Sequence, residues 1–134
     1  MGSEMCIRDR FNELNVNKEK HVLCHNDLDS SNMMFKNDKI VFIDFEYLST
    51  NSKYADLSKL IDSLNLKTLE KNEFLEGYGV DEINDSINIK IKKWSLMNIY
   101  TELIWANYIN EYKRNYFDKD YINLLKNKIK QQKQ

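Results

Sequence analysis

Two aspartates and an asparagine in the first third of this chain have the types and the spacing that metal-assisted phosphoryl transfer needs. Asp27 and Asn32 lie in the segment HNDLDSSN, residues 25–32, and Asp44 follows twelve residues after Asn32. Phosphoryl transfer depends on positioning and charge neutralisation more than on covalent help from the protein. One carboxylate accepts a hydrogen bond from the attacking hydroxyl, while hard oxygen ligands hold Mg²⁺ against the phosphate oxygens. The pattern therefore predicts Asp27 as the catalytic base and Asn32 and Asp44 as ligands of Mg²⁺.

Short strands are expected on both sides of this segment, because apolar and β-branched residues gather there. Residues 21–24 read as a strand that leads into the loop, and residues 33–36 and 39–43 read as two more. Asn37 and Asp38 suit a two-residue hairpin turn, since both residue types tolerate a positive φ. We expect this hairpin to bring the three polar side chains together at one of its edges.

Each of these residues also has an ordinary structural interpretation. A histidine such as His25 more often makes structural hydrogen bonds than takes part in catalysis, and asparagine and aspartate are common in loops. The joint pattern, with its spacing and the hairpin within it, is harder to obtain by chance and favours a segment derived from an active site. We expect His25 to be structural.

The chain resembles the choline/ethanolamine kinase family, one of the aminoglycoside-phosphotransferase-like kinases. The resemblance rests on residues 25–32, residues 43–47 (IDFEY), Asn51 and residues 54–57 (YADL), and it extends over about residues 21–125. The Glu-Tyr pair after Asp-Phe separates the segment from protein kinases, which have glycine there. The resemblance implies an α+β fold, the C-terminal lobe of a protein-kinase-like fold, with a short β-hairpin beside the catalytic loop and an α-helical subdomain after it.

Carried over position by position, the resemblance implies a role for each matching residue. Asp27 matches the family's catalytic base, and Asn32 and Asp44 match its Mg²⁺ ligands, so that Asn32 counts as both catalytic and metal-binding. Glu46 matches the acidic residue beside the metal site. Asp56 matches an aspartate that steadies the catalytic loop, which is a structural role. The implied cofactor is Mg²⁺, and the implied cosubstrate is ATP.

Aromatic residues downstream form a second group of candidates. Residues 103–108 (LIWANY) are similar to the family's W-x-x-W segment in the choline pocket, with Tyr108 in place of the second tryptophan. A quaternary ammonium group cannot donate a hydrogen bond, so ring faces hold it, at about 0.5–2 kcal/mol per contact. The resemblance implies that Trp105, Tyr108 and Tyr121 line the substrate site, with Asp62 near the ammonium group.

The same region also fits the buried face of a helix. Apolar residues recur there every three or four positions, as on a helix face that packs against a core: Ile87, Ile91, Trp94, Met97, Tyr100, Ile104 and Tyr108. Trp105 lies one residue off this stripe, which favours a role in a pocket. Because tyrosine offers a weaker ring face than tryptophan, both choline and ethanolamine stay open as the substrate.

Helices are expected over most of the second half of the chain. Residues 54–66 and 68–76 read as two helices, the second with Thr68 as its cap. A long helix starts at about residues 81–84 and runs to about residue 114, and a last helix runs from 118 to about 130.

Composition and charge exclude several function classes. The 134 residues allow at most one ordinary domain. A net charge of −1 gives no electrostatic case for nucleic-acid binding. No apolar run approaches the roughly 20 residues that span a bilayer, and no secretory signal is evident. Cys6 and Cys24 form no disulfide framework, so a cytoplasmic location is expected.

Glycines are too few and too scattered to form a loop that wraps phosphates, since only Gly2, Gly77 and Gly79 are present. Residues 1–20 are too short for the family's ATP-binding lobe, so the nucleotide-anchoring residues are unknown. The first ten resemble an adapter-derived leader, and residues 1–20 are expected to be non-native or disordered. Residues 21–130 are expected to be the C-terminal lobe, with the N-terminal lobe missing and no activity of the chain alone.

The expected function is transfer of the ATP γ-phosphoryl group to the hydroxyl of a small amino alcohol. One alternative is a related small-molecule kinase of aminoglycoside or homoserine type, for which more carboxylates are expected in place of the rings at 105, 108 and 121. Another is a non-catalytic module that binds a quaternary ammonium group or a partner, which the absent glycine-rich loop favours.

Overall fold

The structure, a computed structural model, describes residues 19–113 and 116–132. Within these residues the chain forms two compact units, and the division follows Ser95. Helix α4 (Asp85–Tyr112) begins in the first unit and ends in the second. The leader expected over residues 1–20 falls almost entirely outside the described residues.

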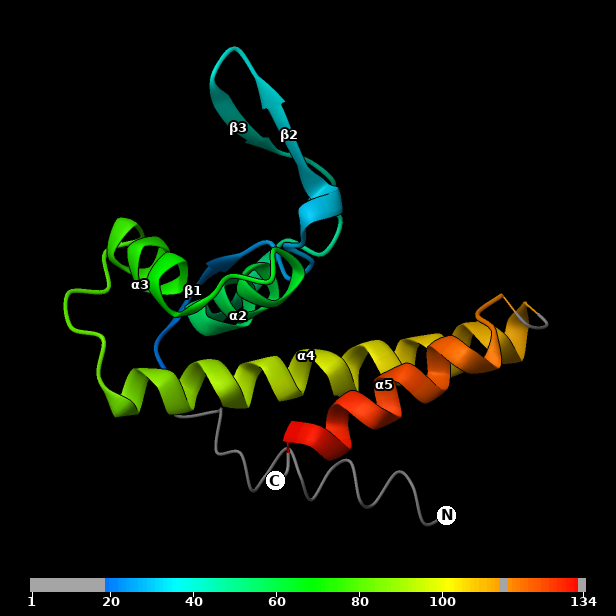
Figure 1. Ribbon diagram of the computed structural model, residues 1–134. Helices are drawn as coiled ribbons and strands as arrows, with labels where there is room; N and C mark the ends of the chain where they lie inside the picture. The colour runs from blue at the N-terminus through cyan, green and yellow to red at the C-terminus, as the bar shows by residue number, and fades with distance from the viewer. Residues whose placement is uncertain (1–18, 114–115, 133–134) are drawn as a thin grey trace. The chain divides into compact units, whose positions relative to one another are not determined.

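Four short strands of the first unit pair as two antiparallel ladders. β1 (His21–Cys24) pairs with β4 (Ser49–Ser52), and β2 (Met33–Lys36) pairs with β3 (Lys39–Phe42). The second ladder is a hairpin that extends from the loop before β2 (Figure 1). The three expected strands are therefore confirmed, although the one expected over residues 39–43 ends one residue early.

A two-residue turn joins β2 to β3, as the sequence predicts. Asn37 and Asp38 have φ angles of 50° and 57°. Both central residues of a type I′ turn need a positive φ, and the twist of this turn matches that of the flanking strands. The turn fixes the register in which Met33 faces Phe42, and so it fixes where the chain leaves the hairpin.

Strand β4 is absent from the sequence prediction. Its four residues, STNS, contain no apolar side chain, so the alternation that marks a strand is missing. The strand forms because its backbone pairs with β1. Its last residue, Ser52, then begins the next helix, since its hydroxyl oxygen accepts a hydrogen bond from the backbone N–H of Tyr54 at 3.3 Å.

In the described residues four α-helices follow the strands, and all four are expected from the sequence. They are α2 (Lys53–Ser63), α3 (Thr68–Gly77), α4 and α5 (Lys119–Gln132). In the part of the chain that the structure describes, no helix combines the length and the apolar character that a membrane crossing needs.

Two helix ends differ from the prediction for local reasons. α2 ends at Ser63, three residues early, and the chain turns away at Asn65, which has a φ of 53°. α3 is capped at Lys67 rather than at Thr68. The Glu70 carboxylate accepts the backbone N–H of Lys67 at 2.8 Å and so satisfies a donor at the helix start.

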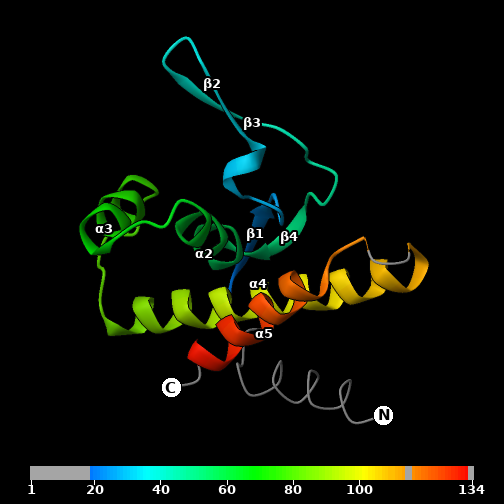
Figure 2. The same ribbon diagram turned by 45° about the vertical axis from the view of Figure 1, so that its right-hand side comes forward.

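The core of the first unit lies between α2 and the β1–β4 ladder (Figure 2). α2 contacts both strands, and its buried residues recur with the spacing of three and four that a helix face requires: Tyr54, Ala55, Leu57, Ser58, Leu60 and Ile61. This packing holds the N-terminal turns of α2 beside the strand that leads into the candidate catalytic loop.

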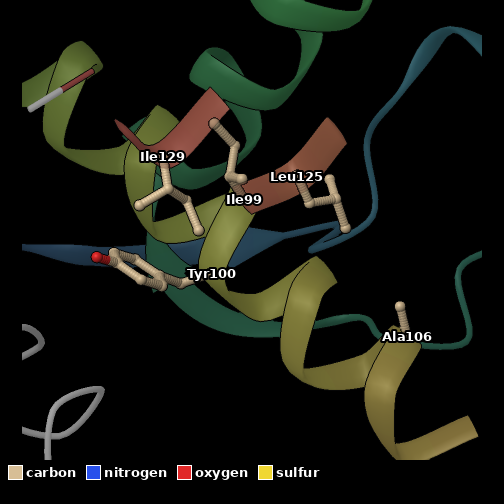
Figure 3. Packing of buried hydrophobic residues seen from close by; sticks show 5 residues of the cluster. All are labelled: Ile99, Tyr100, Ala106, Leu125 and Ile129. Carbon is tan, nitrogen blue, oxygen red and sulfur yellow. The ribbon is translucent and has the colours of Figure 1, made fainter. Parts of the chain in front are cut away.

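The second unit packs α4 against α5 through a small apolar cluster (Figure 3). Its buried members are Ile99, Tyr100, Ala106, Leu125 and Ile129. The stripe expected on α4 is buried from Ile91 to Tyr100, but Ile104 and Tyr108 are 42% and 55% exposed. The prediction was wrong for these two residues, because Ala106 takes the buried position at this end of the helix.

Candidate catalytic loop and ring row

Asp56, in the first turn of α2, anchors the start of the candidate catalytic loop. Its two carboxylate oxygens accept the backbone N–H groups of His25 at 2.7 Å and Asn26 at 2.8 Å. Asn26 has a φ of 65°, a conformation that the contact helps to hold. Because hydrogen bonds to charged groups are the stronger ones, this pair fixes the backbone just before Asp27. These are the contacts expected of a loop-steadying aspartate.

Asn26 is a second anchor of the candidate catalytic loop. Its amide nitrogen donates to the carbonyl oxygen of Tyr47 at 2.9 Å and to the hydroxyl of Ser49 at 2.8 Å. Its amide oxygen accepts a hydrogen bond from Asn51 at 2.9 Å. The loop is thereby tied to the segment after Asp44. The only sequence signal for this role is the position of Asn26 between a candidate structural histidine and a candidate base.

His25 is buried and links the loop to the end of β3. Its Nε2 donates to the carbonyl oxygen of Ile43 at 2.8 Å, and its Nδ1 accepts the backbone N–H of Asp27 at 3.3 Å. The imidazole also contacts the ring of Phe45, with centroids 4.6 Å apart. Both ring nitrogens are therefore engaged within the protein, in the geometry of a structural histidine that positions the residues on either side of Asp44.

Asn32 and Asp27 are in direct contact. The amide nitrogen of Asn32 donates to the carbonyl oxygen of Asp27 at 2.9 Å and to its carboxylate at 3.2 Å. Because the nitrogen faces Asp27, the amide oxygen of Asn32 is turned away from it. The backbone N–H of Ile43 donates to the carbonyl oxygen of Asn32 at 3.0 Å. Asp44 is the residue directly after this hydrogen bond. Asp44 itself has a φ of 63°.

Three carboxylates near Tyr47 concentrate negative charge on this side of the first unit. The pKa of the Tyr47 phenol is raised, first by the charge of Glu46, then by partial burial and a hydrogen bond to Glu46, and further by the charges of Asp27 and Asp44. All three acidic candidates therefore act on one side chain.

The donor set suits Mg²⁺ in its chemistry. In residues 19–113 and 116–132, no group of three or more His, Cys, Asp or Glu side chains could hold a metal ion. Mg²⁺ in phosphate-handling sites needs fewer protein ligands, since one or two carboxylates plus water and substrate phosphates complete its octahedron. An amide oxygen at Asn32 with carboxylates at Asp44 and Glu46 is a set of hard oxygen ligands of this kind.

Trp105 and Tyr121 share a neighbour, Phe117. The ring of Phe117 makes an edge contact with Trp105 at 5.2 Å and stacks on Tyr121 at 5.0 Å, between ring centroids. The hydroxyl of Tyr121 donates a hydrogen bond to the carboxylate of Glu102. We call Trp105, Phe117 and Tyr121 the ring row of the second unit. Phe117 lies outside the LIWANY segment, residues 103–108, and its sequence position gives no signal for such a contact.

The remaining substrate-site candidates make other contacts. Tyr108 is 55% exposed and contacts Tyr112, with ring centroids 4.6 Å apart, rather than the ring row. Asp62 belongs to the first unit, where its carboxylate accepts a hydrogen bond from the hydroxyl of Ser95 at 2.5 Å. The structure thus joins two of the four predicted substrate-binding residues through Phe117.

The thiol of Cys24 is buried beside the catalytic loop, and its stability contribution should depend on pH. Burial, and then the charge of Asp56, raise its pKa from 9.0 to about 11. The folded chain therefore holds this proton more tightly than the unfolded chain does. The contribution is full below pH 9 and is lost as the pH rises through about 11.

This expectation is tested in a chain with Cys6→Ser, so that Cys24 is the one remaining thiol. We expect slow reaction of Cys24 with a thiol reagent near pH 8 and fast reaction in denaturant. We also expect a loss of stability between about pH 9 and 11 in urea titrations that a Cys24→Ala version does not share. Equal pH dependence of the two versions would contradict the expectation.

A catalytic-type loop, a hairpin with Asp44 beyond it and a helical part after it define the C-terminal lobe of a kinase-like fold. The model of the choline/ethanolamine kinase family matches residues 4–133, so the chain belongs to this family. The resemblance expected from the sequence is thereby confirmed.

Curated relatives match over shorter segments. The chain is 44% identical over 57 residues to the protein LicA homolog of Metamycoplasma hominis, a segment that covers 42% of this chain and 23% of that protein. It is 36% identical over 64 residues to protein LicA of Haemophilus influenzae, which covers 47% of this chain and 24% of that protein. The matched segments thus span less than a quarter of the length of these relatives.

Solved structures share the fold at low identity. A choline/ethanolamine kinase family protein from Mesorhizobium loti has a TM-score of 0.78 at 16% identity, over 94% of this chain and 46% of that one. The choline kinase LicA from Streptococcus pneumoniae has a TM-score of 0.77 at 20% identity, over 98% and 48%. LicA in complex with AMP has a TM-score of 0.72 at 19% identity, over 98% and 48%. The predicted fold class is confirmed.

Proposed function

We propose that this chain supplies the catalytic loop of an ATP-dependent phosphotransferase whose acceptor is the hydroxyl of a small amino alcohol, choline or ethanolamine. The observation that carries the proposal is the direct contact between Asn32 and Asp27 in a loop that Asp56 anchors. Family membership supports the reaction class. The contact supports the roles proposed for the two residues, since it holds Asn32, a candidate metal ligand, against Asp27, the candidate base.

Each residue of the loop then has a defined task. The carboxylate of Asp27 accepts the proton of the substrate hydroxyl as the oxygen attacks phosphorus. Asn32 holds that carboxylate in place through its amide nitrogen. His25 and Asp56 fix the backbone around Asp27. Mg²⁺, when bound at Asn32, Asp44 and Glu46, would neutralise the charge on the phosphate oxygens.

ATP is the proposed cosubstrate, and a second lobe is proposed to cover it. A relative of the same fold was solved with AMP, which supports a nucleotide site. The sequence holds three glycines and no glycine-rich loop of its own. In the proposal, residues 21–130 form the catalytic lobe of a larger cytoplasmic enzyme, and the 134 residues alone turn over ATP negligibly.

The ring row is the proposed contact surface for the ammonium group. Trp105 is 46% exposed, so part of its ring is open to a ligand. The Glu102 carboxylate, which accepts a hydrogen bond from the Tyr121 hydroxyl, adds a negative charge close to the rings. A site of ring faces and one carboxylate suits a single ammonium group better than a sugar with several amines. The test is a ³¹P assay of the enzyme with choline, ethanolamine, homoserine and an aminoglycoside. Phosphorylation of an aminoglycoside alone would overturn the proposed acceptor.

Trp105→Ala is expected to raise the KM for choline by about 3- to 30-fold, because one ring contact with the ammonium group is lost. The value of kcat should change much less, since the base and the metal ligands are untouched. Ile104→Ala is a matched control, because Ile104 lies next to Trp105 on α4 and is 42% exposed. A KM that responds equally to both changes would return Trp105 to a packing role.

A further inference from the structure

Lys59 of α2 faces the candidate catalytic loop. Its Nζ lies 3.9 Å from Oδ1 of Asp27, and the two side chains are 23% and 41% exposed. Lys59 follows Asp56 by three residues, so both lie on the same face of the helix. One face of α2 therefore delivers both the carboxylate that anchors the loop and a positive charge beside the candidate base.

A second carboxylate of the loop responds to the same charge. Burial raises the pKa of Asp29, but hydrogen bonds from the hydroxyl and backbone N–H of Ser31 and the charge of Lys59 outweigh it, so the pKa is lowered. The positive charge of Lys59 thus reaches both Asp27 and Asp29. This charge is supplied to the loop from α2.

Stability alone is a weak reason for this arrangement. A partly exposed ion pair at this distance contributes little to folding. Asp27 already accepts a hydrogen bond from Asn32 through its other carboxylate oxygen. The ammonium of Lys59 beside Asp27 has a clearer use if an anionic group, such as a phosphate, binds at the same place. In the proposed reaction the phosphoryl group must approach Asp27, because the attacking hydroxyl is held there.

An arriving phosphate is anionic, and the carboxylates of Asp27 and Asp29 lie on the same loop. The ammonium of Lys59, 3.9 Å from Oδ1 of Asp27, places a positive charge there. A lysine ammonium offers three hydrogen-bond donors and is a common ligand of phosphate oxygens. We propose that Lys59 is a phosphate-binding residue of this site and contacts the phosphoryl group that is transferred at Asp27. The inference rests on the proposed function and adds a residue to it.

The test compares three variants of the full 134-residue chain. Lys59→Gln removes the charge, and Lys59→Arg keeps it. Lys53→Gln removes the same charge from the same helix, at a residue whose ammonium lies over the rings of Tyr54 and Tyr78 instead. The affinities of Mn²⁺ alone and of tripolyphosphate alone are measured for each variant by titration.

Opposite changes for the two probes are the expected result. Lys59→Gln should weaken tripolyphosphate binding by about tenfold and strengthen Mn²⁺ binding by about threefold, because a charge that repels the cation is gone. Lys59→Arg should resemble the unaltered chain. A merely structural role would weaken both probes together, so parallel losses overturn the inference. An effect no larger than that of Lys53→Gln overturns it too, while the proposed function stands. If the unaltered chain binds neither probe, the inference fails, while the proposed function is judged separately by the ³¹P assay of the enzyme.

Discussion

Asp27→Ala is expected to lower the kcat of phosphoryl transfer by about 10²- to 10⁴-fold in the enzyme that contains this lobe, which is the usual contribution of a positioned general base. The carboxylate that is proposed to accept the hydroxyl proton is lost, while the loop keeps its anchors at His25 and Asn26. The measurement is steady-state kinetics with saturating ATP and amino alcohol. Circular dichroism and urea unfolding should show a nearly unchanged fold.

Two further variants sharpen this prediction. Asp27→Asn keeps the shape of the side chain but not its basicity, so it should be about as slow as Asp27→Ala. Asp120→Ala removes an exposed aspartate of α5 and should leave kcat unchanged. Turnover by both Asp27 variants within tenfold of the unaltered enzyme would remove Asp27 from the role of base.

Asp56→Ala is expected to destabilise the protein by about 3 kcal/mol and to disorder the catalytic loop. Two backbone N–H groups, those of His25 and Asn26, would lose a charged acceptor, and each such hydrogen bond is worth about 1.5–3 kcal/mol. The Asn26 backbone would also lose support at its φ of 65°. The measurements are urea unfolding and hydrogen exchange at the two amides.

The isosteric change Asp56→Asn separates charge from shape. An asparagine keeps one acceptor oxygen but presents an amide nitrogen to the second N–H group, so its effect should fall between those of alanine and aspartate. Fast exchange should be confined to the loop and the adjoining strands. Protection of the His25 and Asn26 amides that survives in Asp56→Ala would show that other contacts hold the loop.

The loop and hairpin are well predicted from sequence because their signals are local. Asn37 and Asp38 specify the turn, and the apolar runs on both sides specify the strands. Strand β4 is not predicted because its signal is not local. It forms by pairing with β1, which is far away in the sequence, and its own composition does not indicate a strand.

Contacts between residues far apart in the sequence are the part of the site that the sequence does not predict. Lys59 comes to Asp27 only because α2 packs on the β1–β4 ladder, and an isolated lysine on a helix carries no pattern. Phe117 joins Trp105 to Tyr121 across α4 and the start of α5, which spacing along the chain does not reveal. The buried place of Ala106 likewise follows from the packing of α5.

The measurement that tests the central claim most directly is the paramagnetic effect of Mn²⁺ on amide signals of the ¹⁵N-labelled chain. A divalent cation held beside the catalytic loop should broaden the signals of Asp27, Asn32 and Asp44 first, at the lowest Mn²⁺ concentration, and Asp44→Ala should raise the concentration required. Broadening that begins at other carboxylates, with these three signals unaffected and no response to Asp44→Ala, would contradict the account.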